Sequence, residues 1–320
     1  MSNVSFRNLL SNGISMRIAE AGQGPAILLI HGWPESWFSW RHQLEGLSDA
    51  GYRVIAPDMR GYGETDTPAD PADYRIDILA NDVVGILDAL ELNEVTLIGH
   101  DWGAVVVWNT VLFHPDRFSG VMGMSVPLTP RAERPPLDIW RETMGENFFY
   151  VNYHNEPGGV AEAEYDSDPA ALIKALYASP DTPRHDPLIV DPKRSAGGLV
   201  GRYGVPKEIP AWITETELDY YIEEFTRTGF RGGVNYYRNF NENWKLTERI
   251  DPVLRLPVAF VAGSDDMVID GANEKALRST MQTQATDLRE ITLIDGVGHW
   301  VQQEAPKQTN EAIVRFVRSL

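Results

Sequence analysis

A strand pattern changes to a helix pattern across a sharp turn in the sequence Val95-Thr-Leu-Ile-Gly99-His100-Asp101-Trp102-Gly103-Ala104. The apolar run before the turn is typical of a strand that is buried on both faces. The glycines at 99 and 103 permit a tight turn that lifts Asp101 above the edge of a sheet. A helix-capping aspartate in an ordinary turn is the alternative interpretation of the Gly-x-Asp-x-Gly pattern alone. Because a buried strand precedes it, we predict a nucleophile elbow with Asp101 at its tip.

Other short apolar runs predict the rest of this sheet. A hairpin is expected first, from residues 6–10 and 14–19 around an Asn12-Gly13 turn. Further runs end at turn residues or polar loops and are separated by segments of helical length, such as 76–90 and 271–284. These strand-like runs are 26–30, 52–56, 95–98, 120–124, 257–262 and 289–294. Alternation of this kind predicts an α/β fold with a mostly parallel sheet.

The pattern changes between residues 130 and 245. This segment has no clean strand runs, many aromatic residues and proline clusters at 135–136, 180–187 and 206–210. We therefore predict a core domain built from residues 1–129 and 246–320, and a helical cap from residues 130–245.

Composition narrows the class of function. Of the 320 residues, 43% are hydrophobic and 23% are charged, as in an ordinary globular protein. The formal charge of −18 disfavours nucleic acid and anionic membrane surfaces as partners, so a small neutral substrate is expected. The chain has no cysteine, which excludes disulfides, thiolate metal sites and a cysteine nucleophile.

Location and assembly are less constrained by the sequence. The amino terminus does not have the pattern of a signal peptide, and no apolar run reaches the ~18 residues of a membrane span. We expect a cytoplasmic protein. Its oligomeric state is left open, with a homodimer as one option.

An aspartate at the elbow points to a particular chemistry. An aspartate carboxylate in water has a pKa of about 4, so it is ionised at neutral pH and attacks without the help of a base. This property favours displacement at a saturated carbon over acyl transfer.

Two further loops follow strand-like runs. In His31-Gly32-Trp33-Pro34, after the run at 26–30, backbone N–H groups are positioned to form an oxyanion hole together with the residue after the nucleophile. We expect Trp33 and Trp102 to be the two donors. His31 is expected to brace its loop, and Pro34 to support it.

His299 is the candidate base. It lies in a glycine loop beyond the last strand, in the chain order of nucleophile, acid and histidine. The orienting acid is either Asp265 or Asp266, which follow the preceding strand. Of the remaining histidines, His100 lies within the elbow, and the others are interpreted as solvated or capping residues: His42, His114, His154 and His185.

Four motifs lie in the loops described above: His31-Gly32-Trp33-Pro34-Glu35-Ser36-Trp37, Gly99-His100-Asp101-Trp102-Gly103, Gly263-x-x-Asp266-x-Val268 and Gly298-His299-Trp300. With these motifs the sequence resembles the epoxide hydrolases of the α/β-hydrolase superfamily over nearly the whole chain. The resemblance implies the α/β-hydrolase fold, a mostly parallel sheet with helices on both faces and a helical cap. It implies that Asp266 orients His299 and that the Trp33–Pro34 peptide is cis.

Two segments of the expected cap resemble those that carry ring-opening tyrosines in that family. Phe149-Tyr150 precedes Glu156-Pro157-Gly158, and Tyr236-Tyr237 follows a glycine-rich stretch. The resemblance assigns the proton donors to Tyr150 and Tyr237. Tyr153 and Tyr236 are interpreted as packing residues.

The implied reaction converts an epoxide to a vicinal diol through an ester on Asp101. His299 and Asp266 activate the hydrolytic water, and no metal or organic cofactor takes part. The partners are thus a small apolar epoxide and water. An aryl substrate is suggested by the aromatic residues Trp140, Phe148, Trp212, Phe225 and Phe230, although most of these are also suited to packing inside the cap.

Two alternatives differ from this interpretation. A haloalkane or haloacid dehalogenase has the same nucleophile and His-Asp pair, but a halide leaves without a proton and does not need the tyrosines. A small-molecule receptor on a hydrolase scaffold binds without turnover, and detection of a diol distinguishes it from an enzyme.

Overall fold

The structure is a computed structural model that describes residues 4–320. Residues 1–3, the start of the amino-terminal stretch considered for a signal peptide, lie outside the described residues. Packing divides the chain into two compact units. The first comprises the residues up to Asp66, Ile76–Arg131 and Arg249–Leu320, and the second comprises Thr67–Arg75 and Ala132–Glu248. Residues 67–75 and 246–248, predicted in the core, cluster with the second unit, and residues 130–131, predicted in the cap, cluster with the first.

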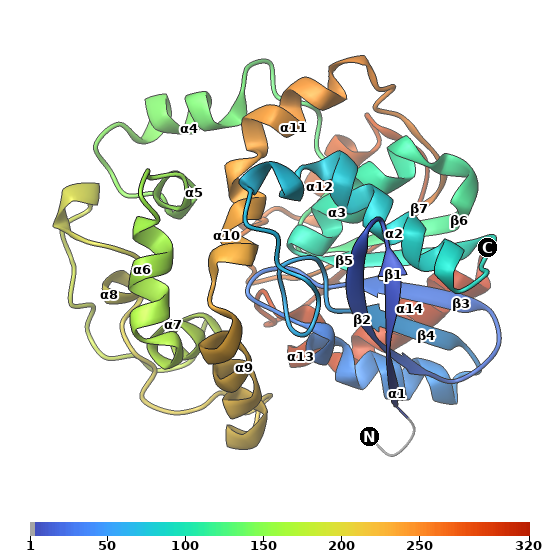
Figure 1. Ribbon diagram of the computed structural model, residues 1–320, viewed down its shortest axis with the longest axis horizontal. Helices are drawn as coiled ribbons and strands as arrows, with labels where there is room; N and C mark the ends of the chain where they lie inside the picture. The colour runs from blue at the N-terminus through green and yellow to red at the C-terminus, as the bar shows by residue number, and fades with distance from the viewer. Residues whose placement is uncertain (1–3) are drawn as a thin grey trace. The chain divides into compact units, whose positions relative to one another are not determined.

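The first unit is built on one sheet, which has eight strands within the described residues (Figure 1). The strand order is β1-β2-β4-β3-β5-β6-β7-β8. β1 pairs antiparallel with β2, and β2 with β4, whereas every other neighbouring pair is parallel. The strands are β1 (Ser5–Ser11), β2 (Ile14–Ala21), β3 (Ala26–Ile30), β4 (Arg53–Pro57), β5 (Val95–His100), β6 (Phe118–Met124), β7 (Leu254–Gly263) and β8 (Ala285–Ile294).

Helices cover both faces of this sheet. Residues an odd number apart on a strand point to opposite faces. A Cβ atom added at Gly120 of β6 would meet Phe316 and Leu320 at the carboxyl end of the chain, whereas one added at Gly123 would meet Trp108 of α3. α3 and α14 therefore lie on opposite faces. The helices of this unit are α1 (Arg41–Asp49), α2 (Ile76–Ala89), α3 (Trp102–Phe113), α12 (Glu274–Met281), α13 (Val301–Glu304) and α14 (Pro306–Arg318).

The predicted mostly parallel α/β sheet is confirmed, with differences at the ends of elements. The hairpin turns at Asn12-Gly13, where both residues have positive φ angles of 47° and 81°. β7 and β8 begin before the runs predicted for them, at Leu254 and Ala285, which pair with each other. The helix predicted at 271–284 is shorter because the Asn273 side chain accepts a hydrogen bond from the Ala276 N–H at 3.0 Å and caps it.

The second unit is helical, as predicted for the insertion. Its residues form isolated bridges, Asn147 with Lys193 and Arg184 with Pro206, but no β-strand within the described chain. A capping box between Thr214 and Glu217 starts its long helix α9. Its helices are α4 (Pro136–Met144), α5 (Tyr150–His154), α6 (Val160–Ser167), α7 (Pro169–Leu176), α8 (Val200–Tyr203), α9 (Glu215–Thr228), α10 (Arg231–Arg238) and α11 (Phe240–Leu246).

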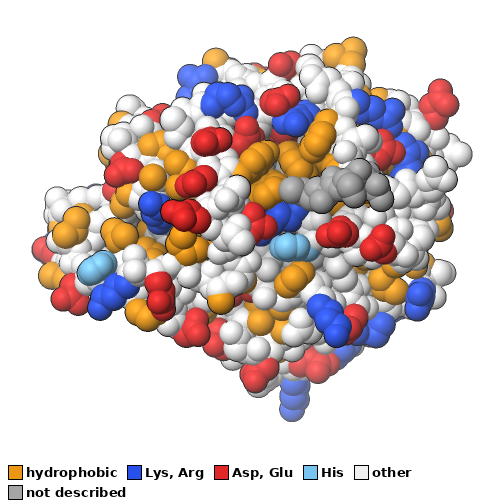
Figure 2. Space-filling model, turned by 90° about the horizontal axis from the view of Figure 1, so that it is seen from below, with side chains coloured by type: hydrophobic (Ala, Val, Ile, Leu, Met, Phe, Trp, Pro, Cys, Tyr) orange, Lys and Arg blue, Asp and Glu red, His pale blue; other side chains and the backbone are white. Residues whose placement is uncertain are grey.

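The surface charges and the helices can be compared with the expectations for nucleic acid and membrane partners. Figure 2 shows a face on which acidic and basic side chains are interspersed, so neither sign of charge forms a continuous field there. Among residues 4–320, no helix is both long enough and apolar enough to cross a membrane.

Candidate active site

Parallel strands bring the predicted residues of the first unit, together with Ser125, to one edge of the sheet. His31 follows β3, Asp101 follows β5, Ser125 follows β6, and Asp266 lies just beyond β7. His299 lies in the loop after β8. Since the carboxyl ends of parallel strands meet at the same edge, these side chains converge there.

The turn at Asp101 has the geometry of a nucleophile elbow. Asp101 has φ 52° and ψ −118°, a conformation that costs a non-glycine residue on the order of 1–3 kcal/mol. A Cβ atom at Gly99 would overlap the Gly103 carbonyl, and one at Gly103 would overlap the Ile30 carbonyl. The two glycines therefore allow α3 to start close against β3 and β5, with Asp101 at its amino end.

The Asp101 carboxylate has a different partner on each oxygen. Oδ1 accepts a hydrogen bond of 2.8 Å from the Trp33 backbone N–H. Oδ2 lies 3.6 Å from Nε2 of His299. Trp33 is joined to Pro34 by a cis peptide bond, and Trp102 is the first residue of α3.

His299 lies between two carboxylates. Its Nδ1 atom is 3.0 Å from each carboxylate oxygen of Asp266, which is 1% exposed and also accepts the Val268 N–H at 2.9 Å. Asp265 is exposed and accepts a hydrogen bond from Ser264. Asp266, and not Asp265, is therefore the carboxylate in contact with His299.

The charges in this cluster shift the pKa values of His299 and Asp266. Burial lowers the pKa of His299, but Asp266 and Asp101 together hold it well above the ordinary 6.5. Burial raises the pKa of Asp266, but the charge and hydrogen bond of His299 hold it below its ordinary value. The two carboxylates thus favour the protonated form of His299.

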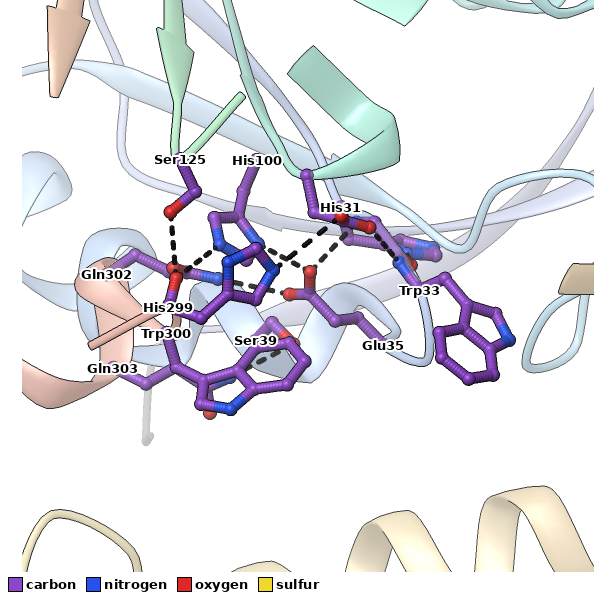
Figure 3. Close-up of polar contacts among 12 residues, drawn as sticks. His31, Trp33, Glu35, Ser39, His100, Ser125, His299, Trp300, Gln302 and Gln303 are labelled. Carbon is purple, nitrogen blue, oxygen red and sulfur yellow. Dashed lines mark hydrogen bonds and ion pairs between the residues drawn. The ribbon is translucent and has the colours of Figure 1, made fainter. Parts of the chain in front are cut away.

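A buried carboxylate and imidazole, Glu35 and His100, support this arrangement (Figure 3). Nδ1 of His100 lies 2.5 Å from Glu35 Oε1, and its Nε2 lies 2.8 Å from the carbonyl oxygen of His299. Glu35 also accepts hydrogen bonds from the Gly32 N–H and the Gln302 side chain, each at 3.0 Å. These contacts tie the loop after β3 to the loop that carries His299.

Sequence reasoning missed this network. Glu35 lies in the motif from His31 to Trp37, but its partner His100 is 65 residues away in the sequence. No local pattern indicates that the two side chains form a pair. It also missed Ser125, whose hydroxyl donates to the His299 carbonyl at 2.8 Å. The signal for Ser125 was its place directly after a parallel strand.

The His31 ring is in contact with backbone groups of Met59 and Gly32. Its Nε2 accepts a hydrogen bond of 3.0 Å from the Met59 N–H, and its Nδ1 lies 2.9 Å from the Gly32 carbonyl. Burial lowers the pKa of His31, so the ring is neutral and can accept that bond.

The two predicted proton donors lie together in the second unit. Tyr150 begins α5 and Tyr237 lies in α10, with ring centroids 5.9 Å apart and an interplanar angle of 79°. Tyr236 is buried and packs against Tyr74, at 5.8 Å between ring centroids. Tyr153 contacts the rings of Phe148 and Tyr165.

The interpretation of His154 as a solvated or capping residue was wrong. Its side chain is completely buried among aromatic rings of the second unit. His185 is exposed, and His114 is half-buried and contacts the Asn81 side chain at 3.0 Å. His42 is half-buried, and its carbonyl accepts a hydrogen bond from Asn310. Sequence alone did not separate His154 from these because its burial depends on residues of α6 and α10.

Several aromatic residues considered for substrate binding pack inside the second unit. Phe225 and Phe230 are buried and stack at 4.5 Å with an interplanar angle of 7°. Trp212 donates to the Ser179 hydroxyl at 2.8 Å.

Within residues 4–320, no three His, Asp or Glu side chains are grouped so that they could hold a metal ion.

Comparison with known proteins identifies the class of this fold and site. Residues 25–306 match the family described as the alpha/beta hydrolase fold. Epoxide hydrolase A of Mycobacterium tuberculosis is 42% identical over 314 residues, which are 97% of this chain and 96% of that protein. Epoxide hydrolase 2 of Siraitia grosvenorii is 38% identical and covers 99% of both chains.

Solved structures agree with these relatives. Epoxide Hydrolase A from Mycobacterium thermoresistibile superimposes with a TM-score of 0.90, at 42% identity and 98% coverage of both chains. An epoxide hydrolase from Vigna radiata has a TM-score of 0.89 at 36% identity, covering 100% of this chain and 99% of that one. The chain therefore belongs to the α/β-hydrolase fold family and, within it, to the epoxide hydrolases.

Proposed function

We propose that this protein hydrolyses an epoxide to a vicinal diol through a covalent ester on Asp101. The observation that carries the proposal is the placement of the Asp101 carboxylate between the Trp33 N–H at 2.8 Å and His299 Nε2 at 3.6 Å. Asp266 lies on the other nitrogen of the same histidine. Membership of the epoxide hydrolase family supports the choice of substrate.

In the first step, a carboxylate oxygen of Asp101 attacks a ring carbon of the epoxide. A carbon–oxygen ester bond forms as the ring carbon–oxygen bond breaks. The expelled alkoxide takes a proton from the phenol of Tyr150 or Tyr237, whose pairing in the second unit supports this role. In this scheme the second unit supplies both phenols.

Ester formation switches His299 into a base. The charge of Asp101 is one of the causes that raise the pKa of His299. An ester carries no charge, so alkylation lowers that pKa. The proton that His299 then releases neutralises the phenolate left by ring opening. The base is therefore generated after ring opening, when it is needed.

In the second step, His299, oriented by Asp266, takes a proton from a water molecule that attacks the carboxyl carbon of Asp101. Negative charge develops on the carboxyl oxygen, where the backbone N–H groups of Trp33 and Trp102 stabilise it. The ester bond breaks, protonated His299 protonates the departing diol oxygen, and Asp101 is re-formed as a carboxylic acid. The proton of that acid returns to His299, which restores the resting charges of Asp101 and His299.

The substrate class is a small, neutral and apolar epoxide. The dehalogenase alternative is not favoured, since the relatives reported above are epoxide hydrolases and a halide has no need of phenol donors. A cytoplasmic location and a homodimer remain predictions from the sequence.

A substrate panel tests the proposal. The purified protein is mixed with styrene oxide, smaller alkyl epoxides and alkyl halides of matched size, and diol and halide release are measured. Diol formation from at least one epoxide, with halide release absent or far slower, is expected. Halide release without diol formation contradicts the proposal.

A further inference from the structure

His154 is buried at the centre of an aromatic cluster in the second unit. Its ring centroid lies 4.4 Å from that of Tyr237, 5.6 Å from that of Tyr150 and 5.7 Å from that of Tyr165. The interplanar angles are 71°, 81° and 89°, so each contact is edge to face, the arrangement that aromatic rings prefer. Tyr150 and His154 are four residues apart on α5 and therefore share one face of that helix.

A hydrogen bond fixes the plane of the His154 ring. Its Nε2 lies 2.9 Å from the hydroxyl oxygen of Tyr165, a fully buried residue of α6. The Tyr165 ring packs in turn against Phe230, at 5.7 Å between ring centroids. A ring that is bonded at one nitrogen and packed on its faces and edges has little freedom to rotate.

The ring also stays neutral. Burial, together with the nearby charge of Arg238, lowers the pKa of His154 to about 3. Arg238 follows Tyr237 in the sequence. Its guanidinium forms an ion pair with the Glu162 carboxylate, with 2.6 Å between the nitrogen and the oxygen. His154 therefore does not gain charge at physiological pH and contributes through its shape and its hydrogen bond to Tyr165.

A hydrogen bond from a side chain to the backbone connects the same two helices. The side chain of Asn155, the residue after His154, donates to the Tyr237 carbonyl at 3.2 Å and to the Val151 carbonyl at 2.8 Å. α5 and α10 are thus joined beside the cluster, and His154 fills the space between the rings that they carry.

We infer that His154 is a positioning residue that fixes the rings of Tyr150 and Tyr237 for protonation of the opening epoxide. The inference rests on the proposed function, in which these two phenols are the proton donors. A misplacement of about 1 Å in a catalytic group can slow a reaction by on the order of a hundredfold. Loss of the His154 ring is therefore expected to slow ring opening and to leave hydrolysis of the ester unchanged.

Rate measurements on the two separate steps test this inference. The alkylation rate with styrene oxide is measured in a His299→Gln background, where the ester accumulates, and ester hydrolysis is measured by single turnover with His299 present. His154→Ala is expected to slow alkylation by about 10- to 100-fold and to change hydrolysis by less than about 2-fold. His154→Phe keeps a ring but loses the bond to Tyr165, so it is expected to recover only part of the lost rate. His185→Ala, at an exposed histidine of the same unit, is the control and should change neither rate.

A mutant cycle distinguishes positioning from a general effect on the fold. If His154 acts through the phenols, His154→Ala has no further effect on alkylation in a Tyr150→Phe/Tyr237→Phe background. Equal slowing in both backgrounds, or a parental alkylation rate in His154→Ala, overturns the inference. If His154→Ala does not fold, Tyr165→Phe removes the anchoring hydroxyl and keeps its ring, and it is expected to slow alkylation alone by about 3- to 10-fold. A parental alkylation rate in Tyr165→Phe then overturns the inference.

The proposed function fails in a different way. If the Tyr150→Phe/Tyr237→Phe enzyme alkylates at the parental rate, the phenols are not the proton donors. If no adduct forms in the His299→Gln background, the covalent route itself is wrong. Neither result is produced by a failure of His154 alone.

Discussion

The backbone N–H of Trp33 donates a 2.8 Å hydrogen bond to Oδ1 of Asp101, the side chain that the proposal makes the nucleophile. In an ester route, negative charge develops on an oxygen of this same carboxyl group during the second step. A donor already in place needs no reorganisation at that moment, which is the main source of stabilisation in an oxyanion hole. The resting structure thus has the donor that ester hydrolysis requires.

Removal of the Asp101 carboxylate is expected to abolish turnover. Asp101→Asn and Asp101→Ala should each lower kcat by more than about 10⁴-fold, because the covalent step has no nucleophile. Asn accepts the positive φ of 52° more readily than Ala, so the two variants separate loss of the carboxylate from backbone strain. Diol formation and thermal unfolding are measured together. A folded Asp101→Ala enzyme with a substantial fraction of wild-type activity contradicts the mechanism.

The two tyrosines are expected to share one role. Tyr150→Phe or Tyr237→Phe should each reduce alkylation by about 10-fold, because the other phenol still donates. The double variant should lose more than about 100-fold. Tyr153→Phe is the control, since Tyr153 packs against Phe148 and Tyr165 and has no part in the mechanism. Stopped-flow alkylation rates for the four variants check this, and a double variant as fast as Tyr153→Phe would show that the phenols are structural.

The proton affinity of His299 should depend on the charge of Asp101. The pKa of His299 lies above 6.5 because Asp266 and Asp101 favour its charged form, so Asp101→Asn should lower that pKa. Asp265→Asn, at the exposed neighbour of Asp266, should leave it unchanged. NMR titration of the imidazole gives all three values. An unchanged pKa in Asp101→Asn would remove the basis for the proposed switch.

The same shift has a consequence for stability. Since the folded-state pKa of His299 is raised, its contribution to the free energy of unfolding is fully present below pH 6.5 and is lost as the pH rises through the folded value. The difference in unfolding free energy between wild type and His299→Gln should therefore shrink on going to alkaline pH. A difference that grows would contradict the direction of the shift.

Glu35 is expected to matter mainly for stability. Burial raises its pKa, but the adjacent His100 more than offsets this, so its pKa lies below the ordinary 4.5. Its stabilisation is present above pH 4.5 and is lost as the pH falls through the folded value. Glu35→Ala leaves a buried partner uncompensated and should lower the free energy of unfolding by about 3–5 kcal/mol at pH 7. Glu64→Ala breaks an exposed pair with Arg17 and should cost less than about 1 kcal/mol.

Urea denaturation at pH 7 and pH 4 measures these differences. The gap between wild type and Glu35→Ala should narrow at the lower pH. Equal losses for Glu35→Ala and Glu64→Ala at pH 7 would mean that the buried Glu35–His100 pair does not stabilise the fold.

The sequence predicted the sheet well because a buried parallel strand requires an apolar run. It located β3 without error and missed the starts of β7 and β8, where Leu254 pairs with Ala285 and, after a register shift, Pro257 pairs with the polar residue Asp287. Hydrogen bonds between strands do not depend on side-chain polarity, so an apolar pattern cannot mark those ends.

The site residues of the first unit were predictable because each lies in a short loop after a strand. The local pattern did not decide whether Asp265 or Asp266 orients His299. In the structure Asp266 is buried, whereas Asp265 is exposed. His100 with Glu35, and His154 with Tyr165, were not predictable because each pair is made by packing between distant elements. A buried histidine has no local signature when its partners come from other helices.

The central claim is the ester on Asp101, and one measurement tests it directly. His299→Gln enzyme is mixed with styrene oxide and its intact mass is recorded, followed by peptide mapping. The account predicts a gain of one substrate mass per chain, located on the peptide that contains Asp101, because ring opening proceeds while ester hydrolysis is stalled. Diol formation by wild type with no adduct in His299→Gln would contradict it, and would mean that water attacks the epoxide directly.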